Sequence, residues 1–295
     1  MAMIHNRSRH RLTAYSLILP FVAIFALVFG YPVIEVIRMS FTDAPLIGEG
    51  DWVGWDNYAR LFSDRLFYTS VVNNGYFVVL TVVPTTVIAL VISLAVNRLS
   101  GRMQALALVF FFTPYVLPVS VVTQIWAWML DFQFGILQPA LEFFTGKPVP
   151  VFKNPHWVMP AVAVVTIWWT NGFNVLLFIA GLRNIPEELY EAAKLDGATR
   201  RQLFFRVTWP LLWPVTALVL TLQLILQLKI FDQIYLLSEG GPFNSSYVLL
   251  LMVYREAFQL NNGGYAAAVS LVLFLLIVVI SVLQFQLLRI GGKEK

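Results

Sequence analysis

The sequence of 295 residues contains no cysteine, which removes disulfide bonds, iron–sulfur clusters and thiolate metal sites from consideration. Its three histidines stand apart in polar segments, without the H-x-x-x-H or H-E-x-x-H spacing of a metal or catalytic pair. We therefore interpret His5, His10 and His156 as solvated loop residues. These absences predict a chain with no metal, no cofactor and no catalytic site of its own.

A phosphate-binding loop is missing as well. Gly146-Lys147 is followed by Pro148 and lacks the first glycine of the G-x-x-x-x-G-K-[ST] motif, so any nucleotide must be bound by a separate subunit. The serines have no general base near them in the sequence, which weighs against a hydrolase. No basic face is interleaved with aromatic residues, so nucleic acid is not a predicted partner.

Charge is scarce throughout the chain. Hydrophobic residues make up 59% of the sequence and charged residues only 12%, against roughly 25% in soluble domains. So few charges cannot cover a water-facing surface, and we expect lipid around most of the protein. A membrane span takes about 20 largely apolar residues. The sequence contains six such stretches, at residues 17–39, 71–96, 105–130, 158–182, 211–237 and 266–288.

The distribution of charge orients these spans. Most lysines and arginines, from Arg7, Arg9 and Arg11 onward, fall on the side of the amino terminus, while acidic residues lean to the other side. The positive-inside rule then predicts that both termini are cytoplasmic. The isoelectric point of 9.3 therefore reports membrane topology. The apolar run at 247–253 is too short to cross, and we expect an interfacial or re-entrant helix on the outer side.

A polar, helix-forming segment separates the fourth and fifth spans. Pro186 suits a first helical position, and two glutamates after it complement the positive end of the helix dipole. Gly197 can take the left-handed conformation that ends a helix. Thr199 and Gln202 have capping-box spacing, and Pro210 is expected to end the second short helix. The segment therefore predicts a helix–turn–helix on the cytoplasmic side.

This segment resembles the EAA loop of the membrane permeases of bacterial ATP-binding-cassette (ABC) importers. Glu191, Ala192, Ala193 and Gly197 stand at the family positions, and Pro210 closes the motif after two apolar replacements. The resemblance implies a coupling loop at about residues 183–209 that lies in a groove of a cytoplasmic ATPase, with Asp196 beside the glycine. The alternative is an amphipathic cytoplasmic turn of no special role.

Amide side chains stand in two of the spans. The fourth span carries the run from Trp168 to Asn174, and the fifth carries Gln223 and Gln227 four residues apart on one helical face. Amides in hydrocarbon need partners. They can hydrogen-bond between helices as structural contacts. Neutral donors and acceptors beside aromatic rings would also suit a hydroxyl-rich ligand such as a sugar.

Charged pairs and prolines near the spans also bear on function. Glu35 and Arg38, and likewise Lys229 and Asp232, are three residues apart and could pair on one helix surface. Four spans hold no charge between their ends, which disfavours a proton relay. Prolines at positions 84, 114 and 118 are expected to interrupt the second and third spans.

Resemblance to the carbohydrate-uptake branch of these permeases covers nearly the whole chain. It rests on Phe231–Leu237, Gly240-Gly241-Pro242, Tyr254–Phe258, Gly264–Ala268 and the outer-loop stretch Trp55–Tyr58 after Gly54. The series is similar to the first permease of a maltose- or glycerol-3-phosphate-type importer, as is the short carboxyl-terminal tail. Two departures stand at positions that line the sugar site there: Leu226 replaces an aromatic residue and Ile230 an amide.

The same resemblance implies a set of residues along a substrate pathway in the fourth and fifth spans. Asn174 is added to this set because it follows Phe173 directly and because an amide at the membrane midplane is costly unless satisfied. The six residues are Trp169, Thr170, Phe173, Asn174, Gln223 and Gln227.

Together these features predict an all-α polytopic membrane protein with six transmembrane helices and a cytoplasmic helix–turn–helix coupling loop, forming one permease domain over residues 1–295. The family implies half of a sugar or polyol pathway in a bacterial inner membrane. Its partners would be a second permease, two cytoplasmic ATP-binding subunits and an extracytoplasmic substrate-binding protein. The alternatives are an ion-coupled or facilitative transporter acting alone, and a membrane scaffold or sensor.

Overall fold

The computed structural model describes residues 15–291, in which all regular secondary structure is helical apart from an isolated bridge between Thr42 and Trp52. The residues form two compact units. One holds the residues before Arg65 together with Val253–Val272, and the other holds Arg65–Met252 together with the residues from Leu273. His5, His10, the amino-terminal arginines at 7, 9 and 11, and the charged tail beyond residue 291 lie outside the described residues.

The first unit contains the amino-terminal helix and the first outer loop. Its elements are the π-helical turn η1 (Ala26–Gly30), α2 (Tyr31–Met39), α3 (Asp56–Ser63) and η4 (Arg255–Gln259). Asn57, from the outer-loop stretch, donates its amide hydrogens to the carbonyls of Ser40 and Thr42 at 2.9 and 2.8 Å. The Tyr58 hydroxyl bonds the Ser40 hydroxyl at 2.7 Å. This stretch therefore fixes the chain where it leaves α2, which is a structural task.

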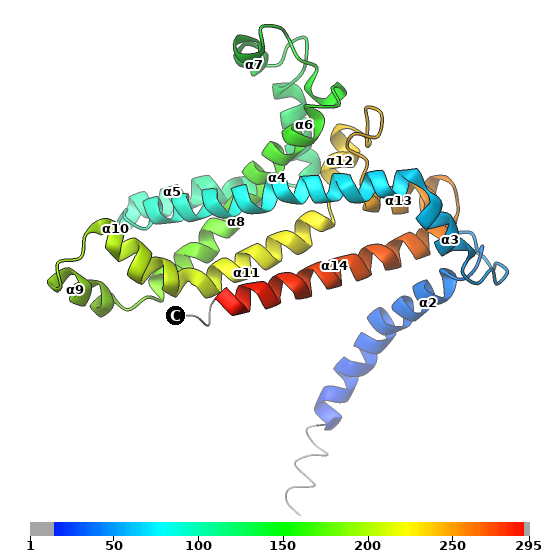
Figure 1. Cartoon of the computed structure of the whole chain (residues 1–295), viewed down its shortest axis with the longest axis horizontal. Coiled ribbons are helices and arrows are strands. Elements are labelled where there is room, and N and C mark those ends of the chain that lie inside the picture. The colour runs from blue at the N-terminus through cyan, green and yellow to red at the C-terminus, as the bar shows by residue number, and fades with distance from the viewer. Residues whose placement is uncertain (1–14, 292–295) are drawn as a thin grey trace, which may run out of the picture. The chain divides into compact units, whose positions relative to one another are not determined.

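The second unit is a bundle in which α8 (Val158–Arg183) packs against α4 (Arg65–Val96), α5 (Gly101–Val116) and α11 (Trp209–Leu228) (Figure 1). Its core includes Ala89 of α4, Phe178 of α8, and Leu212 of α11. The remaining elements of this unit are α6 (Val119–Met129), α7 (Gln138–Thr145), η2 (Val151–Lys153), α9 (Glu187–Leu195), α10 (Arg200–Leu203), η3 (Phe204–Thr208) and α12 (Asp232–Leu237). α13 (Leu249–Tyr254) and α14 (Gly263–Gly291) each run from one unit into the other.

A glycine sets the distance between α5 and α8. A Cβ at Gly172 would fall against the backbone of Phe111 and Phe112. Small residues at such crossings let two membrane helices approach closely, and dispersion contacts then stabilise them. The pairing of α5 with α8 therefore depends on the absence of a side chain at this position.

Five described helices are long and apolar enough to cross a membrane, and a sixth span results if one bent helix pair is counted together. The five, Tyr15–Met39, Arg65–Val96, Val158–Arg183, Arg200–Leu228 and Gly263–Leu288, correspond to the first, second, fourth, fifth and sixth predicted spans. These helices confirm the all-α polytopic architecture. The ion pair expected between Glu35 and Arg38 is also present, with a distance of 3.0 Å.

The third predicted span is not one straight helix. α5 and α6 meet at an angle of 98°, and Leu117 between them is extended, with ψ 139°. Pro118 explains the break, because a proline disfavours the α conformation of the residue before it. The expectation that all three prolines interrupt helices was wrong, since Pro84 and Pro114 lie inside continuous helices.

The fifth predicted span, at 211–237, also ends early. α11 stops at Leu228, and α12 begins only after a break, so Lys229 and Asp232 do not share the helix surface on which we expected them to pair. The buried Asn74 of α4 satisfies the groups around this break. Its amide nitrogen donates to the Leu228 carbonyl at 3.0 Å, and its oxygen accepts from the Leu249 amide at 2.9 Å. A helix end in an apolar bundle needs such a partner.

Candidate functional site

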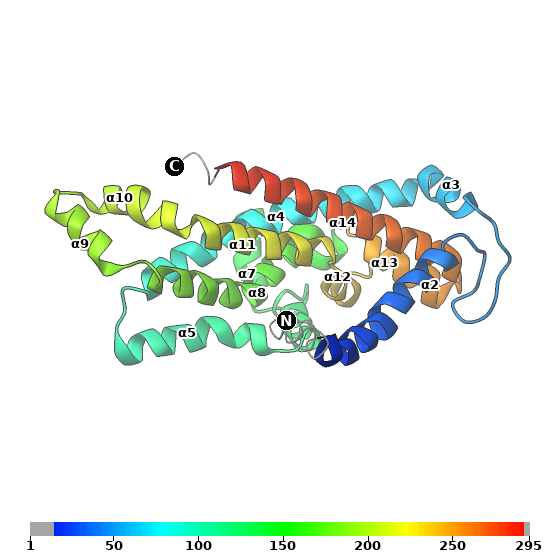
Figure 2. The same cartoon turned by 90° about the horizontal axis from the view of Figure 1, so that it is seen from below.

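The polar loop after α8 folds as a helix, a tight turn and a second helix. Figure 2 shows α9 and α10 at the end of the second unit where α4 turns into α5. The turn is a Schellman motif: the Ala198 amide donates to the Ala193 carbonyl at 2.9 Å, and the Gly197 amide donates to the Lys194 carbonyl at 3.0 Å. Gly197 has φ +78°, so the predicted left-handed glycine is confirmed.

The second loop helix begins with the predicted capping box, in which the hydroxyl of Thr199 and the side chain of Gln202 each bond the other's backbone amide. Two expectations about proline were wrong. Pro186 is the N-cap of α9 and not its first helical residue. Pro210 does not end the second helix, because it lies in the first turn of α11, which continues from α10 through the π-helical turn η3. The helix therefore runs on past Pro210, with a π-helical turn ahead of the proline.

The surface of this loop is open. Glu191, Ala192, Asp196 and Gly197 are exposed and Ala193 is half-buried, so the family positions lie together on one accessible loop. Residues of the turn and of η3, from Ala193 to Val207, line a cavity of about 240 Å³.

Two further features characterise this surface. The apolar side chain of Leu195 is 88% exposed, and those of Leu189 and Phe205 on the same loop are exposed as well. The hydroxyls of Tyr190 and Thr208 bond at 3.0 Å and tie α9 to η3, so the surface is held in place from both sides of the turn.

The three amides that the sequence selected form one buried chain between α8 and α11. Gln227 donates to the Gln223 oxygen at 2.9 Å, and Gln223 donates to the Asn174 oxygen at 3.0 Å. Asn174 is fully buried, and its own amide nitrogen has no hydrogen-bond partner. Leaving a buried donor unpaired costs about 1–3 kcal/mol. The chain therefore joins two helices and keeps one free donor.

The other three candidates contact α5, the segment that follows it, or their own helix. The indole of Trp169 donates to the Leu117 carbonyl at 3.1 Å, and Phe173 stacks on Tyr115 with ring centres 5.2 Å apart. The Thr170 hydroxyl donates to the Thr166 carbonyl at 2.8 Å. The structure thus brings the amides together between α8 and α11, and the aromatic candidates together beside α5.

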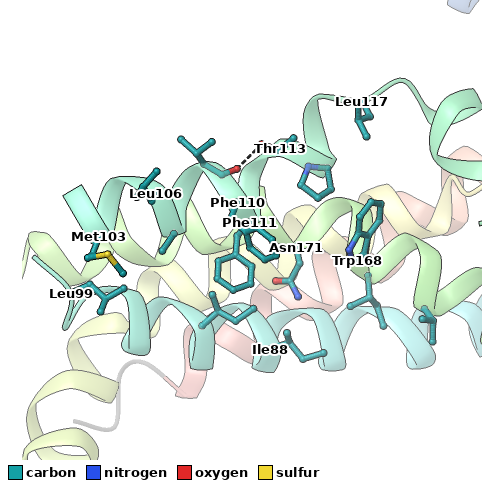
Figure 3. Close-up of a pocket in the computed structure, with 16 residues that line it drawn as sticks. Ile88, Leu99, Met103, Leu106, Phe110, Phe111, Thr113, Leu117, Trp168 and Asn171 are labelled. Carbon is teal, nitrogen blue, oxygen red and sulfur yellow. Dashed lines mark hydrogen bonds between the residues drawn. The ribbon is translucent and has the colours of Figure 1, made fainter. Parts of the chain in front are cut away.

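Asn171 is a further buried amide of α8, which the sequence argument quoted but did not select. It is 7% exposed, its oxygen has no partner, and it lines a cavity of about 1130 Å³ between α4, α5 and α8 (Figure 3). The sequence shows Asn171 as an amide in the middle of the fourth span, but only the packing shows which face of α8 it occupies. Among the described residues, no group of His, Asp and Glu side chains comes together as a metal site requires.

Comparison with known proteins is consistent with this arrangement. Residues 86–289 match the family model described as the binding-protein-dependent transport system inner membrane component. The chain is 30% identical to the sulfoquinovosyl glycerol transport system permease protein SmoG of Agrobacterium fabrum, over 95% of this chain and 91% of the relative. It is 31% identical to the trehalose/maltose transport system permease protein MalF of Thermococcus litoralis, over 93% of each.

A solved structure shares the fold. It is a chain from the crystal structure of a bacterial alginate ABC transporter in complex with an alginate pentasaccharide-bound periplasmic protein. The TM-score is 0.85 at 23% sequence identity, covering 98% of this chain and 98% of that one.

Proposed function

The chain belongs to the family of binding-protein-dependent transport system inner membrane components, and we propose that it forms one half of the translocation pathway of an ATP-driven sugar importer. It is a multi-pass transport permease and not an enzyme. The whole chain, residues 1–295, acts as a single permease domain. It lies in a bacterial inner membrane with both termini in the cytoplasm, as the distribution of basic residues favours.

Three kinds of partner complete the importer in this proposal. A second permease supplies the other half of the pathway, and two cytoplasmic ATP-binding subunits supply the nucleotide sites that this sequence lacks. An extracytoplasmic binding protein delivers the substrate. The alginate importer of similar fold, in complex with its periplasmic protein, supports this last partner. ATP binding and hydrolysis bias the helices between two arrangements.

The loop at residues 183–209 couples this chain to the ATP-binding subunit. One observation carries the proposal: Glu191, Ala192, Ala193, Asp196 and Gly197 stand on one accessible helix–turn–helix whose turn is fixed by its own hydrogen bonds. The partner would cover the exposed side chain of Leu195, whose burial is worth about 1.5–3 kcal/mol.

The transported molecule is a sugar or a related polyol. The relatives named for sulfoquinovosyl glycerol and for trehalose and maltose support this class. The amide chain of Asn174, Gln223 and Gln227 is neutral, and the free donor of Asn174 can be satisfied by a hydroxyl. We place the pathway along these amides, with Trp169, Thr170 and Phe173 beside them on α8. Substrate reaches Asn174 when α8 and α11 move apart.

The experiment is reconstitution. The chain, coexpressed with its second permease and ATP-binding subunit, should copurify with both and be incorporated into proteoliposomes. We expect ATP-dependent uptake of the sugar carried by the cognate binding protein, and stimulation of ATP hydrolysis by the loaded binding protein. Uptake without ATP and without the binding protein would instead identify a transporter acting alone. Stable assembly with no uptake would identify a scaffold or sensor.

Variants of the amides test the pathway separately from assembly. We expect Asn174→Leu and Gln227→Leu to reduce uptake, while copurification and substrate-free ATP hydrolysis stay near wild type. Asn171→Leu is the matched control, because Asn171 is an amide on the same helix that lines the cavity beside α5 and takes no part in the hydrogen bonds to α11. Loss of assembly in the first two variants would show that the amides only join the helices.

A further inference from the structure

The cavity between α4, α5 and α8 has the character of a hydrocarbon site and not of a sugar site. The side chains that line it are almost all apolar, and among them are Ile88, Ile92, Leu106, Phe110 and Ile167. Figure 3 shows them arranged along the helices, with Leu99 and Met103 at one end and Asn171 and Trp168 toward the other. Its volume is about 1130 Å³. We refer to this cavity as the α5 groove.

The α5 groove is at least as long as one leaflet of a bilayer is thick, since its lining extends from Leu99 to Leu117. Both Met103 and Thr113 line it, and at about 1.5 Å per residue they lie about 15 Å apart along α5. The hydrocarbon core of a membrane is about 30 Å thick, so one leaflet accounts for about 15 Å. The amide of Asn171 is a polar group within this lining, and the apolar side chains of Val164 and Ile167 continue the lining beyond it along α8.

The shallow end of the α5 groove is basic. Leu99 and Met103 line it there, and each follows an exposed arginine in the sequence, Arg98 or Arg102. Arg183, at the end of α8, donates to the Gln104 side chain of α5 at 2.8 Å. No described carboxylate forms an ion pair with any of these three arginines. No side chain caps the first turn of α5, whose free amides add to the positive potential.

We propose that the α5 groove binds an anionic phospholipid, whose acyl chain lies along α5 and whose phosphate meets Arg98 and Arg102. Basic sites between helices at the cytoplasmic surface are suited to such headgroups. The proposed topology places this end in the cytoplasm, on the same side as the loop at 183–209. The lipid site does not depend on which sugar is transported, so failure of the sugar assignment would leave it untouched.

The test is native mass spectrometry of the assembled importer, released from vesicles of phosphatidylcholine with and without phosphatidylglycerol. We expect the wild-type complex to retain phosphatidylglycerol. Arg98→Gln with Arg102→Gln should weaken retention about thirtyfold, equivalent to about 2 kcal/mol for two cations near an anionic headgroup. The charge-matched control removes Lys147 and Lys153, two exposed cations of the loop that precedes α8, and should retain the lipid.

A second variant tests the acyl chain. Leu106 is 63% exposed and lines the groove, so Leu106→Trp fills the space without disturbing the core. The Leu106→Trp variant should not retain phosphatidylglycerol even though both arginines are present. The control is Val79→Trp, at an exposed position of α4 outside the groove, which should retain the lipid. If inorganic phosphate displaces phosphatidylglycerol and Leu106→Trp leaves retention unchanged, the site binds a phosphate group without an acyl chain. If the Leu106→Trp variant no longer copurifies with the second permease, the groove is a subunit interface. Either result, or unchanged retention in the arginine variant, would overturn the proposal.

Discussion

The turn of the coupling loop gives the sharpest prediction, because a single glycine holds it. Gly197 has φ +78°, and a Cβ added there would meet nothing within 4 Å. The cost of a substitution is therefore conformational and not a clash. An L-residue in the left-handed region costs about 1–2 kcal/mol, and a β-branched side chain costs more. Because about 1.4 kcal/mol changes an equilibrium constant tenfold, Gly197→Ala should reduce the population of the native turn about five- to thirtyfold.

The structure also predicts an order among substitutions. Asparagine tolerates the left-handed region better than other side-chain-bearing residues, so Gly197→Asn should lose least, Gly197→Ala more and Gly197→Val most. The assay is uptake by the reconstituted importer, together with copurification of the ATP-binding subunit at matched expression. Both quantities should fall in that order.

Gly146 provides a matched control. It ends α7 with φ +71°, and a Cβ there would also meet nothing within 4 Å. α7 precedes α8 whereas α9 follows it, so the two loops leave opposite ends of that helix. Gly146→Val should carry a similar strain without loss of coupling. Equal loss in Gly146→Val, or asparagine no better than valine at Gly197, would refute the reasoning.

Three further predictions concern the loop, the amides and the helix crossing. Glu191→Lys should abolish stimulation of ATP hydrolysis by loaded binding protein, whereas Glu142→Lys, on an exposed turn of α7, should not. Gln223→Leu removes both bonds of the amide chain and should lower the thermal stability of the complex more than Gln227→Leu, which removes one; each orphaned group costs about 1–3 kcal/mol. Gly172→Leu should push α5 from α8 and lower the yield of folded protein in detergent, and a normal yield would contradict the close crossing.

The sequence was sufficient for features that depend on a few neighbouring residues or on composition. The scarcity of charge predicted a membrane bundle, and the structure contains the corresponding helices. The left-handed Gly197 and the capping box of Thr199 and Gln202 were predictable because each is a contact within one turn of backbone. Pro118 was among the expected interruptions for the same local reason.

Other features depended on contacts between segments far apart in the sequence. Asn74, on a different helix, satisfies the Leu228 carbonyl at the end of α11 and the Leu249 amide at the start of α13. The sequence could not show whether Pro210 begins or ends a helix, because only the structure shows that η3 joins α10 to α11.

The amides show the same limit, since Asn171 and Asn174 lie three residues apart on one helix and face different surroundings. Helices that are apolar all round carry no periodic signal of which face is inward. Composition therefore determined that this chain lies in a membrane, and only the packing decided which of its polar groups meet one another and which face a cavity.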